Sequence, residues 1–170
     1  MHKILIATLA AGVMAAGVAQ SATTPASFQV TANVQATCSA SAATLAFGNY
    51  TPGAGALTGS TNVTVKCTKG TAFTVALNAG STAGNSFAQR LMENGAASST
   101  LQYNLFTASN LTTIFGDGSA GTATVVGAGA GVATANAVNV PVFGSLPDSA
   151  TNQAALVGGY SDTIAVTVSY

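Results

Sequence analysis

The feature that most constrains this chain is the alternation of apolar and polar residues with a period of two, which recurs along most of its length. It is cleanest in residues 28–38, where Phe28, Val30 and Val34 share one face with small residues and polar residues occupy the other. Because successive side chains of a strand point to opposite faces of a sheet, this alternation predicts strands with one buried face. Further strands are predicted at residues 45–50, 62–67, 72–78, 100–107, 122–126, 137–143 and 160–170.

Turn-forming residues separate the predicted strands. Short strands divided in this way predict an all-β fold, an antiparallel sandwich in a single domain. No helix is expected after the N-terminal region, and residues 89–94 are predicted to form an edge strand that enters the following turn. The predicted turns are Pro52-Gly53, Asn94-Gly95, Asp117-Gly118, Pro147-Asp148 and Gly158-Gly159.

Two glycine-rich segments match functional patterns that their surroundings do not support. Residues 116–121 (GDGSAG) fit the dinucleotide pattern G-x-G-x-x-G. That site needs a helix next, whereas a strand is predicted, so we expect a hairpin turn and no cofactor. Residues 127–131 (GAGAG) are too few for a silk-like stacked sheet, and a flexible surface loop is predicted there.

The N-terminus has the order of parts of a secretory signal peptide. His2 and Lys3 begin it, an apolar run continues to Ala19, and small residues follow. The run is shorter than the roughly 20 residues of a transmembrane helix. We therefore expect residues 1–21 to be removed on export, leaving a mature chain with no membrane span.

The mature chain, residues 22–170, has few charges and no histidine, which excludes several classes of function. It lacks the basic face that nucleic acid requires and the histidine of a Ser-His-Asp or Cys-His site. A glycosidase-like carboxylate pair stays open, but three of the four acids lie at turns or at a strand start, so no enzyme is expected. A nearly uncharged surface also has little repulsion between copies. The charged residues are Lys66, Lys69, Arg90, Glu93, Asp117, Asp148 and Asp162.

Two cysteines, Cys38 and Cys67, remain in the mature chain. In an exported protein this even count predicts one disulfide. In the chain-entropy model, closing a loop of this length stabilises the fold by on the order of 3–4 kcal/mol. Two thiols without histidine do not complete a zinc site, so no metal is expected.

The two terminal segments carry the pattern with the most functional content. The alternation at the C-terminal end runs to Tyr170, and we expect no later segment to pair with the far edge of that strand. The N-terminal strand is attached to the body at Cys38, and Pro25 marks where its pairing is expected to stop. An unpaired apolar edge without charge promotes association. Either the N-terminal strand of the same chain covers this edge, or a strand of another copy does.

Four motifs and the cysteines carry a resemblance to a known family. The motifs are Leu101-Gln-Tyr103-Asn-Leu105-Phe106, Phe115-Gly-Asp117-Gly118, Val140-Pro141-Val142-Phe143-Gly144 and the ending from Gly159 to Tyr170. Cys38, Phe47-Gly48 and Cys67 fall in the expected order. Over nearly the whole mature chain, this series resembles the spore-coat-U-like pilins of archaic, Csu-type chaperone–usher pili. Phe115 stands where tryptophan or tyrosine is expected, which affects packing more than role.

The resemblance implies an incomplete immunoglobulin-like sandwich (residues 38–170) that lacks its last strand, preceded by a donor segment (residues 22–37). In that family a periplasmic chaperone fills the gap until, at the outer-membrane usher, the N-terminal strand of another subunit replaces it. The implied donor side chains are Phe28, Val30, Ala32 and Val34, and the implied acceptor groove contains Ile164, Val166 and Val168. Asp162 shares that apolar face near its rim, with no role assigned.

The implied function is therefore a structural pilus subunit that serves adhesion and biofilm formation at the cell surface. The implied partners are further copies or related pilins, the chaperone and the usher, and the head-to-tail contact produces an open filament. Two alternatives stay open: a single-domain adhesive or sugar-binding tip module, and an extracellular spore-coat-type protein. The intact N-terminal arm and the absence of tryptophan for stacking on a sugar argue against the tip module.

Overall fold

The computed structural model describes residues 17–95 and 99–170, and these divide into two units, residues 17–33 and residues 34–95 with 99–170. In the first unit, residues 17–33 are exposed and form neither helix nor strand. The predicted signal peptide, residues 1–21, lies largely outside the described residues and stays a prediction. No helix in the described part of the chain is long and apolar enough to cross a membrane.

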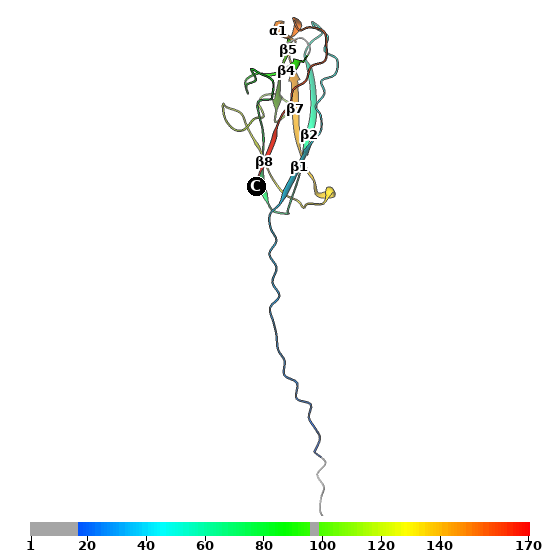
Figure 1. Ribbon diagram of the computed structural model, residues 1–170, viewed down its shortest axis with the longest axis vertical. Helices are drawn as coiled ribbons and strands as arrows, with labels where there is room; N and C mark the ends of the chain where they lie inside the picture. Colours follow the sequence, from blue (N-terminus) through cyan, green and yellow to red (C-terminus); the bar gives the residue numbers. More distant parts are fainter. Residues whose placement is uncertain (1–16, 96–98) are drawn as a thin grey trace, which may run out of the picture. The chain divides into compact units, whose positions relative to one another are not determined.

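The second unit is an antiparallel β-sandwich (Figure 1). One sheet has the strand order β1-β2-β7-β5-β4 and the other has the order β6-β3-β8. The predicted all-β antiparallel sandwich is confirmed. Its elements are β1 (Cys38–Ala42), β2 (Leu57–Cys67), β3 (Ala72–Leu77), β4 (Arg90–Asn94), β5 (Ser99–Phe106), β6 (Val125–Ala128), the short 3-10 helix η1 (Thr134–Asn136), β7 (Val138–Leu146), the one-turn helix α1 (Ala150–Gln153) and β8 (Val166–Ser169).

The core lies between the two sheets and follows the period-two pattern. In β2 every second side chain from Val63 onward is buried, and β3 presents its own alternate residues from the opposite sheet. Burying one large apolar side chain contributes roughly 1.5–3 kcal/mol. Phe115 is fully buried, so the replacement of the expected Trp or Tyr leaves an aromatic core residue there. The other buried apolar residues are Val63, Val65, Cys67, Phe73, Val75, Leu77, Leu101, Tyr103, Leu105, Val140, Val142 and Leu146.

Two predicted strands are not strands in the structure. Residues 28–37 join no ladder, and the first strand begins only at Cys38. Residues 45–50 are also outside the ladders, although Leu45 and Phe47 pack against the core. Alternation in these segments therefore marks a one-sided distribution of apolar side chains and not strand pairing.

Other predicted elements are found with changed bounds. The edge strand expected at residues 89–94 is confirmed as β4, at the end of its sheet. The strand expected over residues 160–170 is shorter in the structure: it is β8, which pairs with β3 only from Val166 to Ser169.

β1 was not expected, since its sequence CSASA has no β-branched residue. The one-turn helix α1 was not expected either, and the Ser149 side chain caps it by accepting a hydrogen bond from the Asn152 backbone.

The two glycine-rich segments behave differently from each other. Residues 116–121 form a turn, as predicted, with Gly118 and Gly121 in the left-handed region at φ 88° and 76°. The prediction of a hairpin is wrong, because Phe115 and Ala123 on either side of the turn form a parallel bridge. The prediction of a flexible loop at residues 127–131 is wrong in part, because β6 includes Gly127 and Ala128. Gly129 is buried against β2, where a Cβ would collide with Cys67 and with the Thr68 backbone. Glycine is needed here for close packing.

Gly129→Ala should therefore destabilise the sandwich. The added methyl group has no space against Cys67 and the backbone, and overpacking of this kind costs about 1–3 kcal/mol. Urea unfolding of the purified mature chain, followed by circular dichroism, measures this loss of free energy. Gly95→Ala is the matched control, because its Cβ would meet no described atom within 4 Å. Equal stability of the two variants would contradict the close-packing role of Gly129.

Candidate functional site

An apolar groove with a volume of about 960 Å³ opens into the sandwich. One wall is residues 42–52, which follow β1, and the other is residues 155–166, which lead into β8. Within the described residues, no strand lies between these walls. The floor is made of core side chains from both sheets, among them Val63, Leu77, Leu101, Leu105 and Val142. A strand placed here would cover side chains of the core.

The predicted acceptor residues lie on the C-terminal wall and on the strand that continues it. Ile164, Val166 and Val168 are half-buried and pack against the core, while the residues between them are exposed. Ile164 and Val166 line the groove, whereas Val168 lies beyond it in β8, opposite Val75 of β3. Their role in accepting a strand stays a prediction.

The predicted donor residues are exposed. The exposed fraction is 88% for Phe28 and 81% for both Val30 and Val34. Ala32 is exposed as well. Large apolar side chains repeated at every second position in this way gain free energy from any partner that covers them. Their role as donors also stays a prediction.

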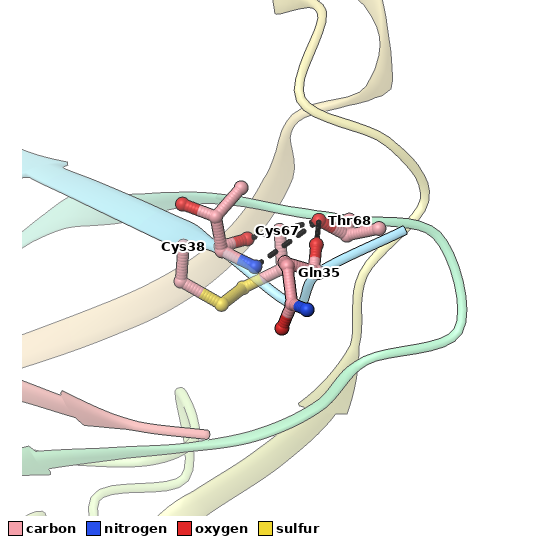
Figure 2. The surroundings of a disulfide bond; sticks show 5 residues. Gln35, Cys38, Cys67 and Thr68 are labelled. Carbon is pink, nitrogen blue, oxygen red and sulfur yellow. Dashed lines mark hydrogen bonds between the residues drawn. A yellow bond between two sulfur atoms is a disulfide. The ribbon is translucent and has the colours of Figure 1, made fainter. Parts of the chain in front are cut away.

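The residues just before β1 are fixed to the end of β2 (Figure 2). The predicted disulfide between Cys38 and Cys67 is confirmed, and these residues face each other in the β1–β2 ladder. Next to it, the Thr68 backbone N–H donates to the Thr37 carbonyl at 2.9 Å, and the Thr37 N–H donates to Thr68 Oγ1 at 3.1 Å. The Thr68 hydroxyl also donates to the Gln35 carbonyl at 3.3 Å. The predicted donor segment is therefore held covalently and by hydrogen bonds at its base.

The wall at residues 42–52 is fastened by Asp148, which lies between β7 and α1. The Tyr50 hydroxyl donates to Asp148 Oδ1 at 2.5 Å, and the backbone N–H groups of Gly53 and Gly55 donate to the same carboxylate at 3.1 and 3.0 Å. The hydrogen bond from Tyr50, supported by those from the two glycines, lowers the pKa of Asp148 to about 2. Desolvation and the contact with Asp148 raise the pKa of Tyr50 to about 12.

The wall at residues 155–166 is fastened by Asp162, to which sequence reasoning gave no role. Ser81 and Thr82 each donate to Oδ1 through both backbone N–H and hydroxyl, at 2.9–3.2 Å. The Tyr103 hydroxyl and the Asn85 amide donate to Oδ2 at 2.6 and 3.0 Å. Burial of the carboxyl works to raise its pKa, but these hydrogen bonds outweigh it and leave the pKa of Asp162 below its ordinary value. A lone acid on the apolar face of the predicted strand was the signal, since such a group needs partners.

Arg90 of β4 extends the polar network beneath this wall. Its guanidinium is fully buried and donates to the Asn104 side chain at 2.6 Å and to the carbonyls of Asn78 and Phe115 at 2.8 Å each. Burial lowers the pKa of Arg90, while nearby Tyr103 and Asp162 act in the opposite direction. The sequence holds a single arginine, and its place in a predicted edge strand gave no hint of this burial.

Comparisons with known proteins agree with this architecture. Residues 24–167 match the family described as SCPU, the Spore Coat Protein U domain. No curated protein matches the chain significantly.

Among solved structures, the fold resembles a chain of the CsuC–CsuE chaperone–tip adhesion subunit pre-assembly complex from the archaic chaperone–usher Csu pili of Acinetobacter baumannii. The TM-score is 0.56 at 21% sequence identity, over 81% of this chain and 40% of that one. The present chain thus spans less than half of its structural neighbour, and the likeness is one of fold.

Acid titration should reveal the contact between Tyr50 and Asp148. The pKa of Asp148 is about 2 in the fold, against roughly 3.9 in an unfolded chain. Its contribution to stability is therefore complete above about pH 4 and is lost as the pH falls through about 2. We expect Asp148→Asn to reduce the fall in the free energy of unfolding over this range, and Tyr50→Phe to reduce it less.

Urea unfolding of the mature chain between pH 2 and pH 5 measures this dependence. Tyr170→Phe is the matched control, because the Tyr170 side chain is exposed, and it should leave the acid limb unchanged. An Asp148→Asn variant with the same acid limb as the parent chain would contradict the assignment.

Proposed function

This chain belongs to the Spore Coat Protein U domain family, and from that membership we propose that it is a structural subunit of a chaperone–usher pilus. The observation that carries the proposal is the apolar groove between residues 42–52 and 155–166, open to a strand from outside. A strand added to a sheet edge gains main-chain hydrogen bonds, and its alternate side chains enter pockets. The groove has the free edge and the apolar floor that such binding requires.

The strand that enters the groove is the N-terminal segment of another copy or of a related pilin. Phe28, Val30 and Val34 are large, apolar and exposed in the arm of this chain. Each contributes roughly 1.5–3 kcal/mol when it is fully buried, and Ala32 suits a shallow position between them. Because donor and acceptor are different surfaces of the subunit, repetition of this contact builds an open filament.

A periplasmic chaperone covers the groove before assembly, and an outer-membrane usher joins the subunits. The structural neighbour supports this step, since it belongs to a pre-assembly complex of a chaperone with a tip adhesion subunit. Residues 1–21 direct export, and the assembled filament lies at the cell surface, where it serves adhesion and biofilm formation. This role is structural and not catalytic.

A tip adhesion module is the second candidate, because the structural neighbour comes from a complex with a tip adhesion subunit. In the present chain, however, a donor-type arm precedes the sandwich. A subunit that both donates and accepts a strand suits the interior of a filament. We therefore favour a shaft or adaptor subunit.

Deletion of residues 23–36 should abolish polymerisation and leave a folded sandwich. The deletion removes the proposed donor face but neither cysteine of the disulfide. The measurement is the ladder of SDS-resistant oligomers in unboiled samples, with circular dichroism as the check on folding. A deletion variant that still forms the ladder would refute the donor assignment.

A face-specific pair of variants separates the donor face from mere arm length. Replacing Phe28, Val30 and Val34 with serine removes the apolar face and should weaken the ladder severely. Replacing the intervening Gln29, Thr31 and Asn33 with alanine changes as many residues on the polar face and should preserve it. Equal loss in both variants would exclude a one-sided donor strand.

A further inference from the structure

Each wall of the groove is tied down by one carboxylate, and these are two of the four acids of the mature chain. Asp148 holds Tyr50 and the Gly53–Gly55 turn, and Asp162 holds the C-terminal wall. Neither carboxylate bonds a basic side chain among the described residues. Both accept hydrogen bonds from hydroxyl and backbone N–H groups, and Asp162 also accepts one from the Asn85 amide. Because each carboxylate anchors one wall of the same groove, the two have corresponding positions.

The wall at residues 42–52 has few other hydrogen bonds. At its start, the Ala43 backbone N–H donates to the Asn62 carbonyl at 3.3 Å and the Ala43 carbonyl accepts from the Thr61 hydroxyl at 2.9 Å. Among the described residues, no further backbone hydrogen bond is found for residues 44–49 before the Asp148 contact is reached. The hydrogen bonds that hold this wall therefore lie near its two ends, at β2 and at Asp148.

The wall at residues 155–166 is held largely by side chains rather than by a ladder. β3 ends at Leu77, and the loop that follows supplies the donors that bind Asp162. The Asn78 side chain accepts from the Ala165 backbone N–H at 2.9 Å, and Ser161 forms a two-bond bridge with Glu93 of β4. Asp162 has the most partners of these anchors.

Tyr103 connects the two walls through the floor. Its hydroxyl donates to Asp162 at 2.6 Å, and its ring packs edge-on against Phe47 of the opposite wall with centroids 6.1 Å apart. Gly144 in β7 leaves the space that Leu45 and Phe47 occupy, since a Cβ there would touch both side chains. The separation of the walls is thus built by particular contacts.

We propose that Asp148 and Asp162 are positioning residues that hold the groove walls apart, so that a subunit needs them to accept a strand but not to donate one. This inference rests on the proposed function. The driving force against which they act is the hydrophobic effect, which favours collapse of either loosened wall onto the apolar floor. A carboxylate suits the task because it accepts several hydrogen bonds at once, and charged acceptors bind more strongly than neutral ones.

The test compares acceptance and donation by the same full-length mature chain. Acceptance is measured as the uptake of a fluorescent peptide of residues 23–36, by anisotropy. Donation is measured as the SDS-resistant dimer formed with a size-tagged parent chain whose groove is intact. We expect Asp148→Asn and Asp162→Asn each to reduce the rate of peptide uptake at least about tenfold, equivalent to about 1.4 kcal/mol, while still donating to the parent chain.

Asp117→Asn is the matched control, because Asp117 accepts hydrogen bonds from Ser119 within the turn at residues 116–121 and does not line the groove. It should accept peptide at the parental rate. Should circular dichroism show that an Asn variant does not fold, Tyr50→Phe and Tyr103→Phe test the inference instead. Each removes one hydrogen-bond donor from one carboxylate and should likewise slow the uptake of peptide.

Folded variants that take up peptide at the parental rate would overturn the inference, and so would loss of donation together with acceptance. Failure of the parent chain itself to bind the peptide would overturn the proposed function instead, and with it the basis of this inference. The two failures are therefore distinguishable.

Discussion

The other features of this structure depend on the open apolar groove. Its floor consists of the same side chains that form the core, and its walls are chain segments without a ladder between them. Water in contact with such a floor is unfavourable, and an unpaired strand edge invites another chain. A sandwich of this kind gains free energy from an added strand. Under the proposed function, the disulfide, the anchored walls and the exposed arm all contribute to accepting or donating such a strand.

The arm is fixed to the sandwich at its base and is exposed upstream of that point. Cys38 is bonded to Cys67, and Thr68 binds the backbone of Thr37 and the carbonyl of Gln35. Upstream, Phe28 and Val30 of the proposed donor face are exposed and lie in neither helix nor strand. In a filament, tension on the donor strand would pass through Cys38 into two strands of the sandwich. A covalent link at this point keeps such tension from peeling β1 off its sheet.

Much of the sandwich could be predicted from alternation, because β2, β3, β5 and β7 bury one face each and carry their apolar residues on it. The same rule failed at residues 45–50, where Leu45 and Phe47 pack on the core from a segment with no ladder. Gly129 was misassigned because close packing depends on a neighbour distant in sequence. Asp162 went unassigned for the same reason: its partners lie some 60 to 80 residues away.

The distribution of charge follows from the groove as well. Arg90 is buried and donates to Asn104 and to two backbone carbonyls, while the partly buried Asp162 accepts a hydrogen bond from Tyr103, so both charges are used within the fold. The Asp148 carboxylate accepts a hydrogen bond from Tyr50 of the opposite wall. What remains outside is a surface of few charges, and copies of such a surface can approach each other with little repulsion. The carboxylates of Asp148 and Asp162 thus anchor the segments that border the groove, and under our proposal the small number of charges elsewhere favours the contact between subunits.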